Sequence, residues 1–193
     1  MKVKNEDKTL LLILDLDETL IYATEEPLEW EADFRVGHYH VYQRPFLQEF
    51  IRGVREEYQL AVWSSATDDY VEDMVHHIFG EEPGLEFAWG RSRCTYRRNL
   101  QFEDFRDTEQ DHHYLKPLKK VRRRGYVLER ILVVDDTQQK LKRNYGNAIY
   151  VREYRGNPED REVELLLEYL KQLKEAVNVR KVEKRGWWLQ VGG

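Results

Sequence analysis

The segment LLLILDLDETL, which begins at Leu10, constrains the fold of this chain more than any other stretch. Its five consecutive apolar residues, 10–14, predict a short strand that is buried on both faces, as the strands of a parallel sheet are. Two carboxylates, Asp15 and Asp17, follow directly. Because a buried carboxylate is costly unless an opposite charge pairs with it, the end of this strand predicts a site that binds or reacts.

Strand and helix patterns alternate along the rest of the chain. Apolar runs predict further buried strands at residues 59–63, 131–134 and 148–151. Apolar residues at helical spacing predict helices that begin after Pro45, near residue 68 and after Pro158. This alternation predicts an α/β fold with a doubly wound, mostly parallel sheet and helices on both of its faces.

The length and the loops predict a single domain over residues 1–193, since a chain of this size buries one sizeable core. The polar and aromatic segment at about 80–115 predicts a small β insertion. The segment from Thr19 to Pro45 is too short for a large cap domain, so we expect the strand ends to be open to large ligands.

The composition limits the partners and the location that we expect. A net charge of -5 argues against a general nucleic-acid binder, which is usually basic over a whole face. Cys94 is the only cysteine, which excludes an internal disulfide. The first residues show no signal-peptide pattern, and no apolar run approaches the ~20 residues of a membrane helix. We therefore expect a monomer without membrane contact that is cytoplasmic, or nuclear if the source is eukaryotic.

Polar side chains follow three of the predicted strands. Asp15 and Asp17 follow the first, Ser64 and Ser65 the second, and the pair 135–136, both aspartates, the third. In open α/β sheets, ligands bind beyond the carboxyl ends of the strands, where these side chains would converge. Four carboxylates in one crevice repel one another unless a cation neutralises them, and oxygen ligands favour a hard cation such as Mg²⁺.

Four short motifs together resemble one known family. DLDETL at 15–20 resembles the DxDx[TV] signature of the haloacid dehalogenase (HAD) superfamily of phosphoryl-transfer enzymes. RPF at 44–46, YLK at 114–116 and VVDD at 133–136 are similar to the C-terminal-domain (CTD) phosphatase-like family, which includes the small CTD phosphatases, NLI-interacting factor and Dullard-type phosphatases. The resemblance runs from about residue 9 to about residue 175. It implies a HAD Rossmann-like fold and a phosphatase.

The resemblance implies four catalytic residues. Asp15 is the expected nucleophile, because a carboxylate can form an aspartyl-phosphate that water later hydrolyses. Asp17 is expected to act as general acid and then as general base. Ser64 matches the hydroxyl of the second family motif, although its neighbour Ser65 is an alternative. Lys116 matches the lysine that neutralises the nucleophile and the phosphoryl oxygens.

The remaining implied roles concern the metal and the substrate. Mg²⁺ is expected to be held by Asp15, the backbone carbonyl of Asp17 and the pair 135–136, of which either Asp135 or Asp136 binds directly. Many family members carry Asp-Asn at this pair, so Asp-Asp keeps the oxygen ligands and adds one negative charge. The expected substrate-binding residues are Thr19, which also fixes the turn by hydrogen bonds, Ser65 and Thr67.

Three functions are compatible with these residues. The first is a Mg²⁺-dependent phosphomonoester hydrolase that acts on phosphoprotein, at phosphoserine, phosphothreonine or phosphotyrosine. The second is a phosphatase of nucleotide or polynucleotide ends, which a basic cluster at residues 119–124 favours and the net charge disfavours. The third is a catalytically silent module that binds phosphorylated partners. The intact residues Asp15, Asp17, Lys116 and Asp136 argue against this third function.

Overall fold

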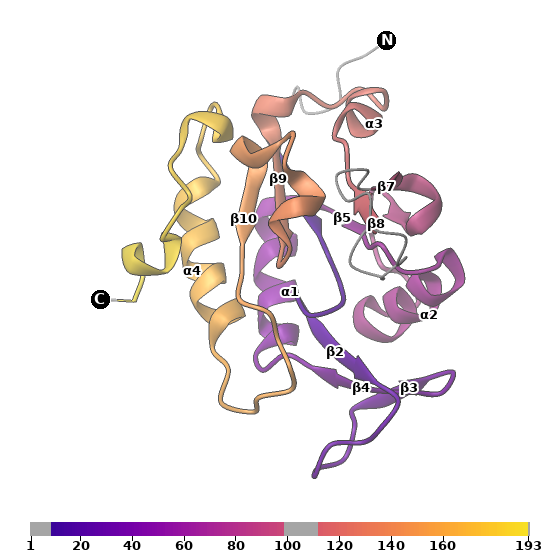
Figure 1. The fold of residues 1–193 in the computed structure, drawn as a ribbon. Coiled ribbons are helices and arrows are strands. Elements are labelled where there is room, and N and C mark those ends of the chain that lie inside the picture. The colour runs from indigo at the N-terminus through magenta and orange to yellow at the C-terminus, as the bar shows by residue number, and fades with distance from the viewer. Residues whose placement is uncertain (1–8, 99–111, 193) are drawn as a thin grey trace, which may run out of the picture.

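The structure is a computed structural model, and it describes residues 9–98 and 112–192. Five parallel strands form its central sheet, in the order β10-β9-β1-β5-β6. Their bounds are β1 (Leu10–Leu14), β5 (Tyr58–Trp63), β6 (Ala88–Trp89), β9 (Ile131–Asp135) and β10 (Ala148–Tyr150). β1 lies in the middle, and all five of its residues are buried. The predicted α/β fold with a mostly parallel sheet is confirmed (Figure 1).

Side chains alternate between two cores, one on each face of the sheet. Leu10, Leu12 and Leu14 join the larger core, and Leu11 and Ile13 join the smaller one. The larger core packs against α1 (Leu47–Glu57), α2 (Asp68–Phe79) and α4 (Glu162–Leu173), and the smaller core against α3 (Lys119–Arg122). Both faces of β1 are therefore covered, as its uninterrupted apolar sequence predicts.

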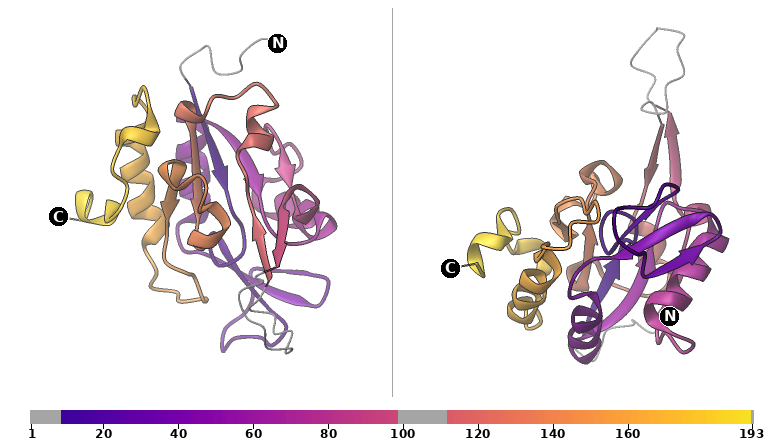
Figure 2. Two further views of the ribbon diagram at one scale, coloured as in Figure 1. Left: turned by 45° about the horizontal axis from the view of Figure 1, so that its top comes forward. Right: turned by 90° about the horizontal axis from the view of Figure 1, so that it is seen from below.

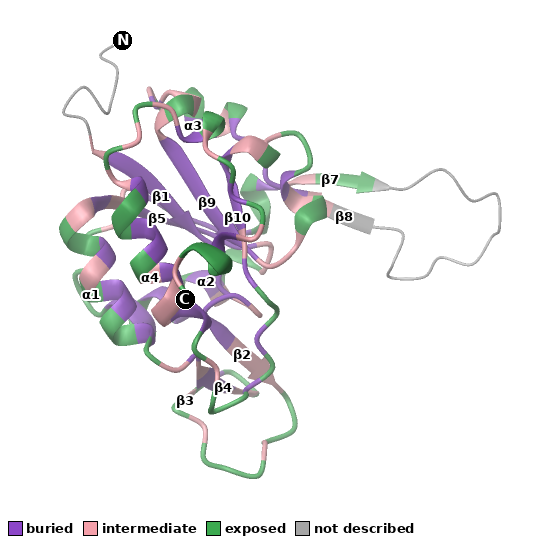
Figure 3. Ribbon diagram, turned by 90° about the vertical axis from the view of Figure 1, so that its left-hand side faces the viewer, coloured by how far each residue is buried: buried purple, intermediate pink, exposed green. Residues whose placement is uncertain are grey.

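Two small antiparallel pieces project from the central sheet in different directions (Figure 3). The first is a sheet of β2 (Ile21–Thr24), β4 (Tyr39–Gln43) and β3 (Phe34–Val36). The second is a ribbon of β7 (Thr95–Arg98) and β8 (His112–Leu115). The described residues hold no larger cap domain than these two pieces.

The segment predicted as an insertion, at about 80–115, contributes to two parts of the fold. Its strand β6 pairs with β5 in the central sheet, and its later residues form the β7–β8 ribbon. Residues 99–111 of the segment lie outside the described residues. The assignment of residues 1–193 to a single domain stays a prediction.

Short 3-10 helices and the C-terminal segment complete the molecule. The 3-10 helices are η1 (Arg91–Arg93), η3 (Leu128–Arg130), η4 (Gln138–Leu141), η5 (Tyr145–Asn147), η6 (Val179–Lys181) and η7 (Trp187–Gln190). The C-terminal segment lies with α4 beside β10, on the side of the molecule away from α2 (Figures 1 and 2). Among the helices of the described residues, none has the length and apolar character needed to cross a bilayer.

Candidate active site

The carboxyl ends of β5, β1 and β9 bring the predicted residues to one edge of the sheet. Leu14 of β1 pairs with Val62 of β5 on one side and with Val134 of β9 on the other. The residues that follow, among them Asp15 and Asp135, therefore lie side by side. The backbone N–H of Asp15 continues the ladder by donating to the carbonyl of Val134 at 3.0 Å.

Asp15 is buried between two lysines. The Lys116 ammonium lies 2.8 Å from Oδ1 of Asp15 and 2.6 Å from Oδ2 of Asp135, with all three side chains buried. The Lys140 ammonium lies 2.7 Å from Oδ2 of Asp15. Burial alone raises the pKa of Asp15, but the two ammonium groups outweigh burial and lower this pKa to about 2. Asp15 is therefore a carboxylate at neutral pH.

Lys140 is a residue of this cluster that the sequence reasoning missed. Besides Asp15, its ammonium contacts Oδ1 of Asp136 at 3.2 Å and Oδ1 of Asp135 at 3.4 Å. Lys140 lies on η4, four residues after Asp136, and its backbone carbonyl accepts a hydrogen bond from the N–H of Lys116 at 2.8 Å. The i,i+4 spacing in DDTQQK was the available signal, because residues four apart on a helical turn are neighbours.

Asp17 lies in a different environment from Asp15. Its Oδ1 accepts a hydrogen bond from the hydroxyl of Tyr70 at 2.6 Å, and its Oδ2 accepts one from the hydroxyl of Ser64 at 3.3 Å. Burial is the largest influence on Asp17 and raises its pKa, although both hydroxyls favour the charged form. The sequence reasoning also missed Tyr70, which reaches Asp17 from the first turn of α2.

Thr19 supports the site from inside the fold. Its side chain is fully buried, and its hydroxyl accepts a hydrogen bond from the backbone N–H of Asp136 at 3.2 Å. Glu18, just before it, has a φ of 57°, in the left-handed region, which turns the chain sharply after Asp17. This hydrogen bond joins the turn after β1 to the loop after β9, and the expected substrate-binding role of Thr19 stays a prediction.

Ser64, Ser65 and Thr67 differ in how much of each is open to a ligand. Ser64 is buried, and its hydroxyl also accepts a hydrogen bond from the N–H of Ala66 at 3.0 Å. Ser65 is half-buried, and its carbonyl accepts a hydrogen bond from Nε of Arg91. Thr67 is exposed and precedes α2 without a capping hydrogen bond from its side chain. The substrate-binding roles of Ser65 and Thr67 stay predictions.

Three of the carboxylates are close enough to hold a metal ion together. Asp15, Asp135 and Asp136 each offer an oxygen atom, and these atoms lie within 4.8 Å of one another. The donor set consists of oxygen atoms and so suits a hard divalent cation such as Mg²⁺. Apart from contacts with Lys140, both oxygens of Asp135 have donors, Lys116 at Oδ2 and the N–H of Thr137 at Oδ1, 2.9 Å away. Asp15 and Asp136 each have one such oxygen, since Oδ2 of Asp15 and Oδ1 of Asp136 contact only Lys140 among the described residues.

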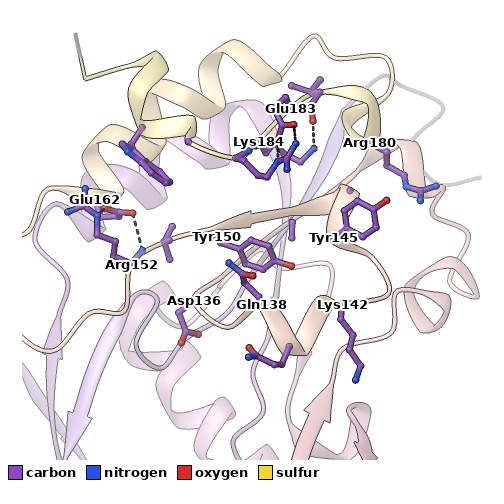
Figure 4. A pocket seen from close by; sticks show the side chains of 18 of the residues that line it. Asp136, Gln138, Lys142, Tyr145, Tyr150, Arg152, Glu162, Arg180, Glu183 and Lys184 are labelled. Carbon is purple, nitrogen blue, oxygen red and sulfur yellow. Dashed lines mark hydrogen bonds and ion pairs between the residues drawn. The ribbon is translucent and has the colours of Figure 1, made fainter.

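A cavity of about 990 Å³ opens beside Asp136 (Figure 4). Residues of η4, η5 and β10 line it on one side, and residues of η6 and the C-terminal segment line it on the other. Trp187 joins the two sides, since its Nε1 donates to the carbonyl of Tyr150 at 2.9 Å.

The fold and the pairing of Asp15 and Asp135 with the buried Lys116 define a HAD-like α/β protein of the kind that transfers phosphoryl groups. The model of one family, the NLI interacting factor-like phosphatases, matches residues 10–180. The chain belongs to this family, which confirms the resemblance drawn from its motifs. The match also confirms that the predicted class of enzyme is a phosphatase.

Individual relatives agree with the family. A CTD small phosphatase-like protein 2 of Dictyostelium discoideum is 25% identical, over 88% of this chain and 28% of the relative. A human carboxy-terminal domain RNA polymerase II polypeptide A small phosphatase 1 is 24% identical, over 94% of this chain and 65% of the relative. A nuclear envelope morphology protein 1 of Saccharomyces cerevisiae is 22% identical, over 93% of this chain and 42% of the relative. The chain thus spans less than two thirds of the length of each of these relatives.

One solved structure supports the fold. The structure of Fcp1, an RNA polymerase II CTD phosphatase, superposes with a TM-score of 0.57 at 19% identity, over 96% of this chain and 53% of Fcp1. At this level of identity the likeness concerns the fold.

Proposed function

We propose that this protein is a Mg²⁺-dependent phosphomonoester hydrolase that acts on phosphoprotein through an aspartyl-phosphate on Asp15. The observation that carries the proposal is the contrast between the two carboxylates that follow β1. Asp15 is held as a carboxylate by Lys116 and Lys140, whereas burial raises the pKa of Asp17 toward the protonated form. A pair of carboxyl groups whose environments separate their pKa values suits a nucleophile and a general acid.

The first half of the reaction transfers the phosphoryl group to Asp15. An oxygen of Asp15 forms a bond to phosphorus while the bond between phosphorus and the leaving oxygen breaks. Asp17 gives its proton to that leaving oxygen. Lys116 and the hydroxyl of Ser64 lie beside the two carboxylates, where they would stabilise charge on the phosphoryl oxygens.

The second half of the reaction releases phosphate. Asp17, now a carboxylate, takes a proton from water as the water oxygen attacks the phosphorus of the aspartyl-phosphate. The bond between phosphorus and the Asp15 oxygen breaks, which restores the starting carboxylate. The hydroxyl of Tyr70, 2.6 Å from Asp17, holds the general base in place during this step.

Mg²⁺ fits this site through oxygen ligands. We assign its binding to Asp15, Asp136 and the backbone carbonyl of Asp17, since Asp135 is committed to Lys116 and Thr137. Bound there, the ion supplies positive charge that reduces repulsion between the Asp15 carboxylate and the phosphate.

Phosphoprotein is the substrate class that the relatives favour. The human relative is named for the C-terminal domain of RNA polymerase II, a protein segment. The described residues also hold no large cap domain that would close over the site and admit only small metabolites. We keep cytoplasmic location and a monomeric state as predictions, with nuclear location supported by a relative named for the nuclear envelope.

The basic cluster that favoured nucleic-acid ends is partly engaged inside the fold. The Lys120 ammonium donates to the carbonyls of Arg93 at 2.6 Å and of Cys94 at 3.0 Å. Arg124 donates to the carbonyl of Glu86 and covers the ring of Phe87 at 5.1 Å. Because these cations stabilise the β6–η1 region, we do not propose nucleic-acid ends as a second function.

An aryl-phosphate assay tests the proposal. We expect hydrolysis of para-nitrophenyl phosphate with Mg²⁺, loss of activity in EDTA, and recovery when excess Mg²⁺ is added. Full activity in the chelator would contradict the metal assignment. A folded protein that binds phosphate but hydrolyses no aryl phosphate under any metal condition would instead support the silent binding module.

A further inference from the structure

We propose that Lys140 and Mg²⁺ exchange at the candidate active site, so that the Lys140 ammonium neutralises the carboxylates whenever the metal is absent. This inference rests on the proposed function for the identity of the metal. Its basis is that the Lys140 ammonium contacts Asp15 at 2.7 Å and Asp136 at 3.2 Å, the two side chains to which we assign the metal. It also lies 3.4 Å from Asp135.

The two lysines of the cluster differ in their freedom to move. The Lys116 side chain is fully buried, and its ammonium contacts Asp15 at 2.8 Å and Asp135 at 2.6 Å. The Lys140 side chain is 17% exposed. Its backbone is fixed, since its N–H donates to the carbonyl of Thr137 and its carbonyl accepts from Lys116. Only the side chain of Lys140 therefore has to swing out for the ammonium to leave.

A divalent cation and this ammonium cannot share one set of oxygen atoms. Oδ2 of Asp15 and Oδ1 of Asp136 are both within hydrogen-bond distance of the Lys140 ammonium. A metal bound to those oxygens would lie next to a like charge, which the repulsion between them disfavours. Mg²⁺ thus binds only the fraction of molecules in which Lys140 has moved away, and its apparent affinity is reduced by that fraction.

Binding of Mg²⁺ to the variant Lys140→Met tests the exchange without any activity measurement. By titration calorimetry after removal of metal, we expect Lys140→Met to bind Mg²⁺ at least about tenfold more tightly than the wild type. In EDTA, its melting temperature should lie below that of the wild type, because three neighbouring carboxylates lose a cation. Saturating Mg²⁺ should recover most of that difference.

Two further variants make the test decisive. Lys142→Met removes an exposed lysine two residues away and should bind Mg²⁺ as the wild type does. Lys140→Arg keeps the positive charge and should not tighten binding, and it serves as the folded comparison if Lys140→Met does not fold. Equal or weaker Mg²⁺ binding by Lys140→Met would overturn the exchange. Absence of Mg²⁺ binding in wild type and variants alike would overturn the metal assignment of the proposed function as well.

A separate observation concerns the cavity beside Asp136. We infer that it binds an acidic stretch of the phosphoprotein substrate next to the phosphorylated residue, an inference that rests on the proposed function. Six cationic and three acidic side chains line the cavity, although the whole chain carries a net charge of -5. The cavity therefore concentrates positive charge at the margin of the candidate active site.

Three of the six cationic side chains in the cavity wall have partners, and three do not. Arg152 pairs with Glu162, and Arg185 pairs with Glu183. Lys184 is buried and donates to the carbonyls of Val179 and Val182. The other three, the exposed Lys142, Arg180 and Lys181, make no side-chain hydrogen bond or ion pair with any of the described residues.

Two of the unpaired cations lie at the same end of the cavity. Lys142 and Arg180 lie on the side away from Arg152 and Glu162 (Figure 4). The Lys184 ammonium donates to the carbonyls of Val179 and Val182, which flank Arg180 and Lys181 and hold the backbone of η6 in place. A chain that enters the active site and continues along the cavity would place acidic side chains against them.

Matched phosphopeptides test this inference. One peptide carries acidic residues on one side of its phosphoserine, a second carries them on the other side, and a third carries glutamine and asparagine instead. We expect one acidic peptide to have a kcat/KM roughly fivefold to tenfold above the neutral peptide, as three surface ion pairs would give. The preference should shrink at high salt.

Charge-reversal variants test whether the preference depends on the cavity cations or on the net charge of the protein. The triple variant Lys142→Glu, Arg180→Glu and Lys181→Glu should lose the preference and keep wild-type hydrolysis of para-nitrophenyl phosphate. The same change of net charge on α3, with Lys119, Arg122 and Arg123 replaced by glutamate, should keep the preference. The inference would be overturned if the wild type showed no preference for an acidic peptide, or if the cavity variant kept that preference. If the wild type hydrolysed no aryl phosphate, the proposed function itself would be overturned.

Discussion

Replacement of Asp15 by asparagine is expected to abolish turnover of aryl phosphates and phosphopeptides. The amide keeps the shape of the carboxylate, but its oxygen is too weak a nucleophile to form a stable bond to phosphorus. We expect kcat to fall at least about a hundredfold, which corresponds to roughly 3 kcal/mol of transition-state stabilisation. The measurement is steady-state hydrolysis of para-nitrophenyl phosphate with saturating Mg²⁺.

The same substitution is expected to lower stability at neutral pH without unfolding the protein. The Asp15 pKa is lowered from 3.8 to about 2, so the folded state favours the charged carboxylate. This contribution is fully present above pH 4, is lost as the pH falls toward 2, and amounts to about 2 kcal/mol. Asp15→Asn lacks this contribution to stability at every pH, and it leaves Lys116 and Lys140 with fewer partners. Circular dichroism and urea denaturation at neutral pH measure the loss.

A matched variant separates chemistry from stability. Asp69→Asn changes an exposed carboxylate in the first turn of α2 and should leave both kcat and the fold unchanged. If folded Asp15→Asn kept more than about a tenth of the wild-type rate, Asp15 would not be the nucleophile and the aspartyl-phosphate route would be wrong.

The sequence was sufficient for those parts of the fold that depend on local pattern. Five apolar residues in a row predicted β1 as a strand buried on both faces, and its side chains alternate between two cores. The topology of parallel strands then predicted that Asp15 and Asp135 would converge, which their positions in the sheet confirm. These inferences needed only periodicity and the rule that parallel strands end at one edge.

Residues that reach the site through tertiary contact were beyond local pattern. Tyr70 lies on α2 between acidic residues, and only the docking of that helix aims its hydroxyl at Asp17. For Lys140, the i,i+4 spacing indicates only the contact with Asp136, and its contact with Asp15 depends on how the fold places η4 beside β1. The backbone bond from Lys116 to the Lys140 carbonyl connects segments 24 residues apart, so the double-lysine arrangement follows from the fold rather than from either segment alone.

The RPF motif at 44–46 is part of the family resemblance, and the structure gives its Arg44 a physical role. The Arg44 side chain is buried, and its guanidinium makes two hydrogen bonds to Asp160, at 2.7 and 2.9 Å. It also donates to the carbonyl of Thr19 at 2.8 Å and to that of Arg152 at 3.0 Å. Oδ1 of Asp160 in turn accepts from the N–H of Glu162 at the start of α4. Arg44 therefore connects the turn after β1 to the segment that leads into α4.

Arg44→Met is accordingly expected to cause a large loss of stability. The substitution keeps an unbranched side chain of similar length but leaves two carbonyls and a carboxylate without their donor. Breaking a buried pair typically costs 3–5 kcal/mol, and we expect about 3 kcal/mol because the Asp160 side chain keeps some contact with water. For a protein of this size, that loss lowers the melting temperature by roughly 6–12 °C. Urea denaturation and thermal unfolding measure both quantities.

Three comparisons identify the cause of the loss. Arg44→Lys keeps the charge but not the two-pronged geometry, so its stability should lie between those of the wild type and Arg44→Met. Arg52→Met removes an exposed arginine on α1 and should change the free energy of unfolding by less than about 0.5 kcal/mol. Because Arg44 and Asp160 contact each other directly, Arg44→Met combined with Asp160→Asn should cost less than the sum of the single changes. If the free energy of unfolding of Arg44→Met lay within about 1 kcal/mol of the wild-type value, the guanidinium would not be the group that connects the turn after β1 to α4.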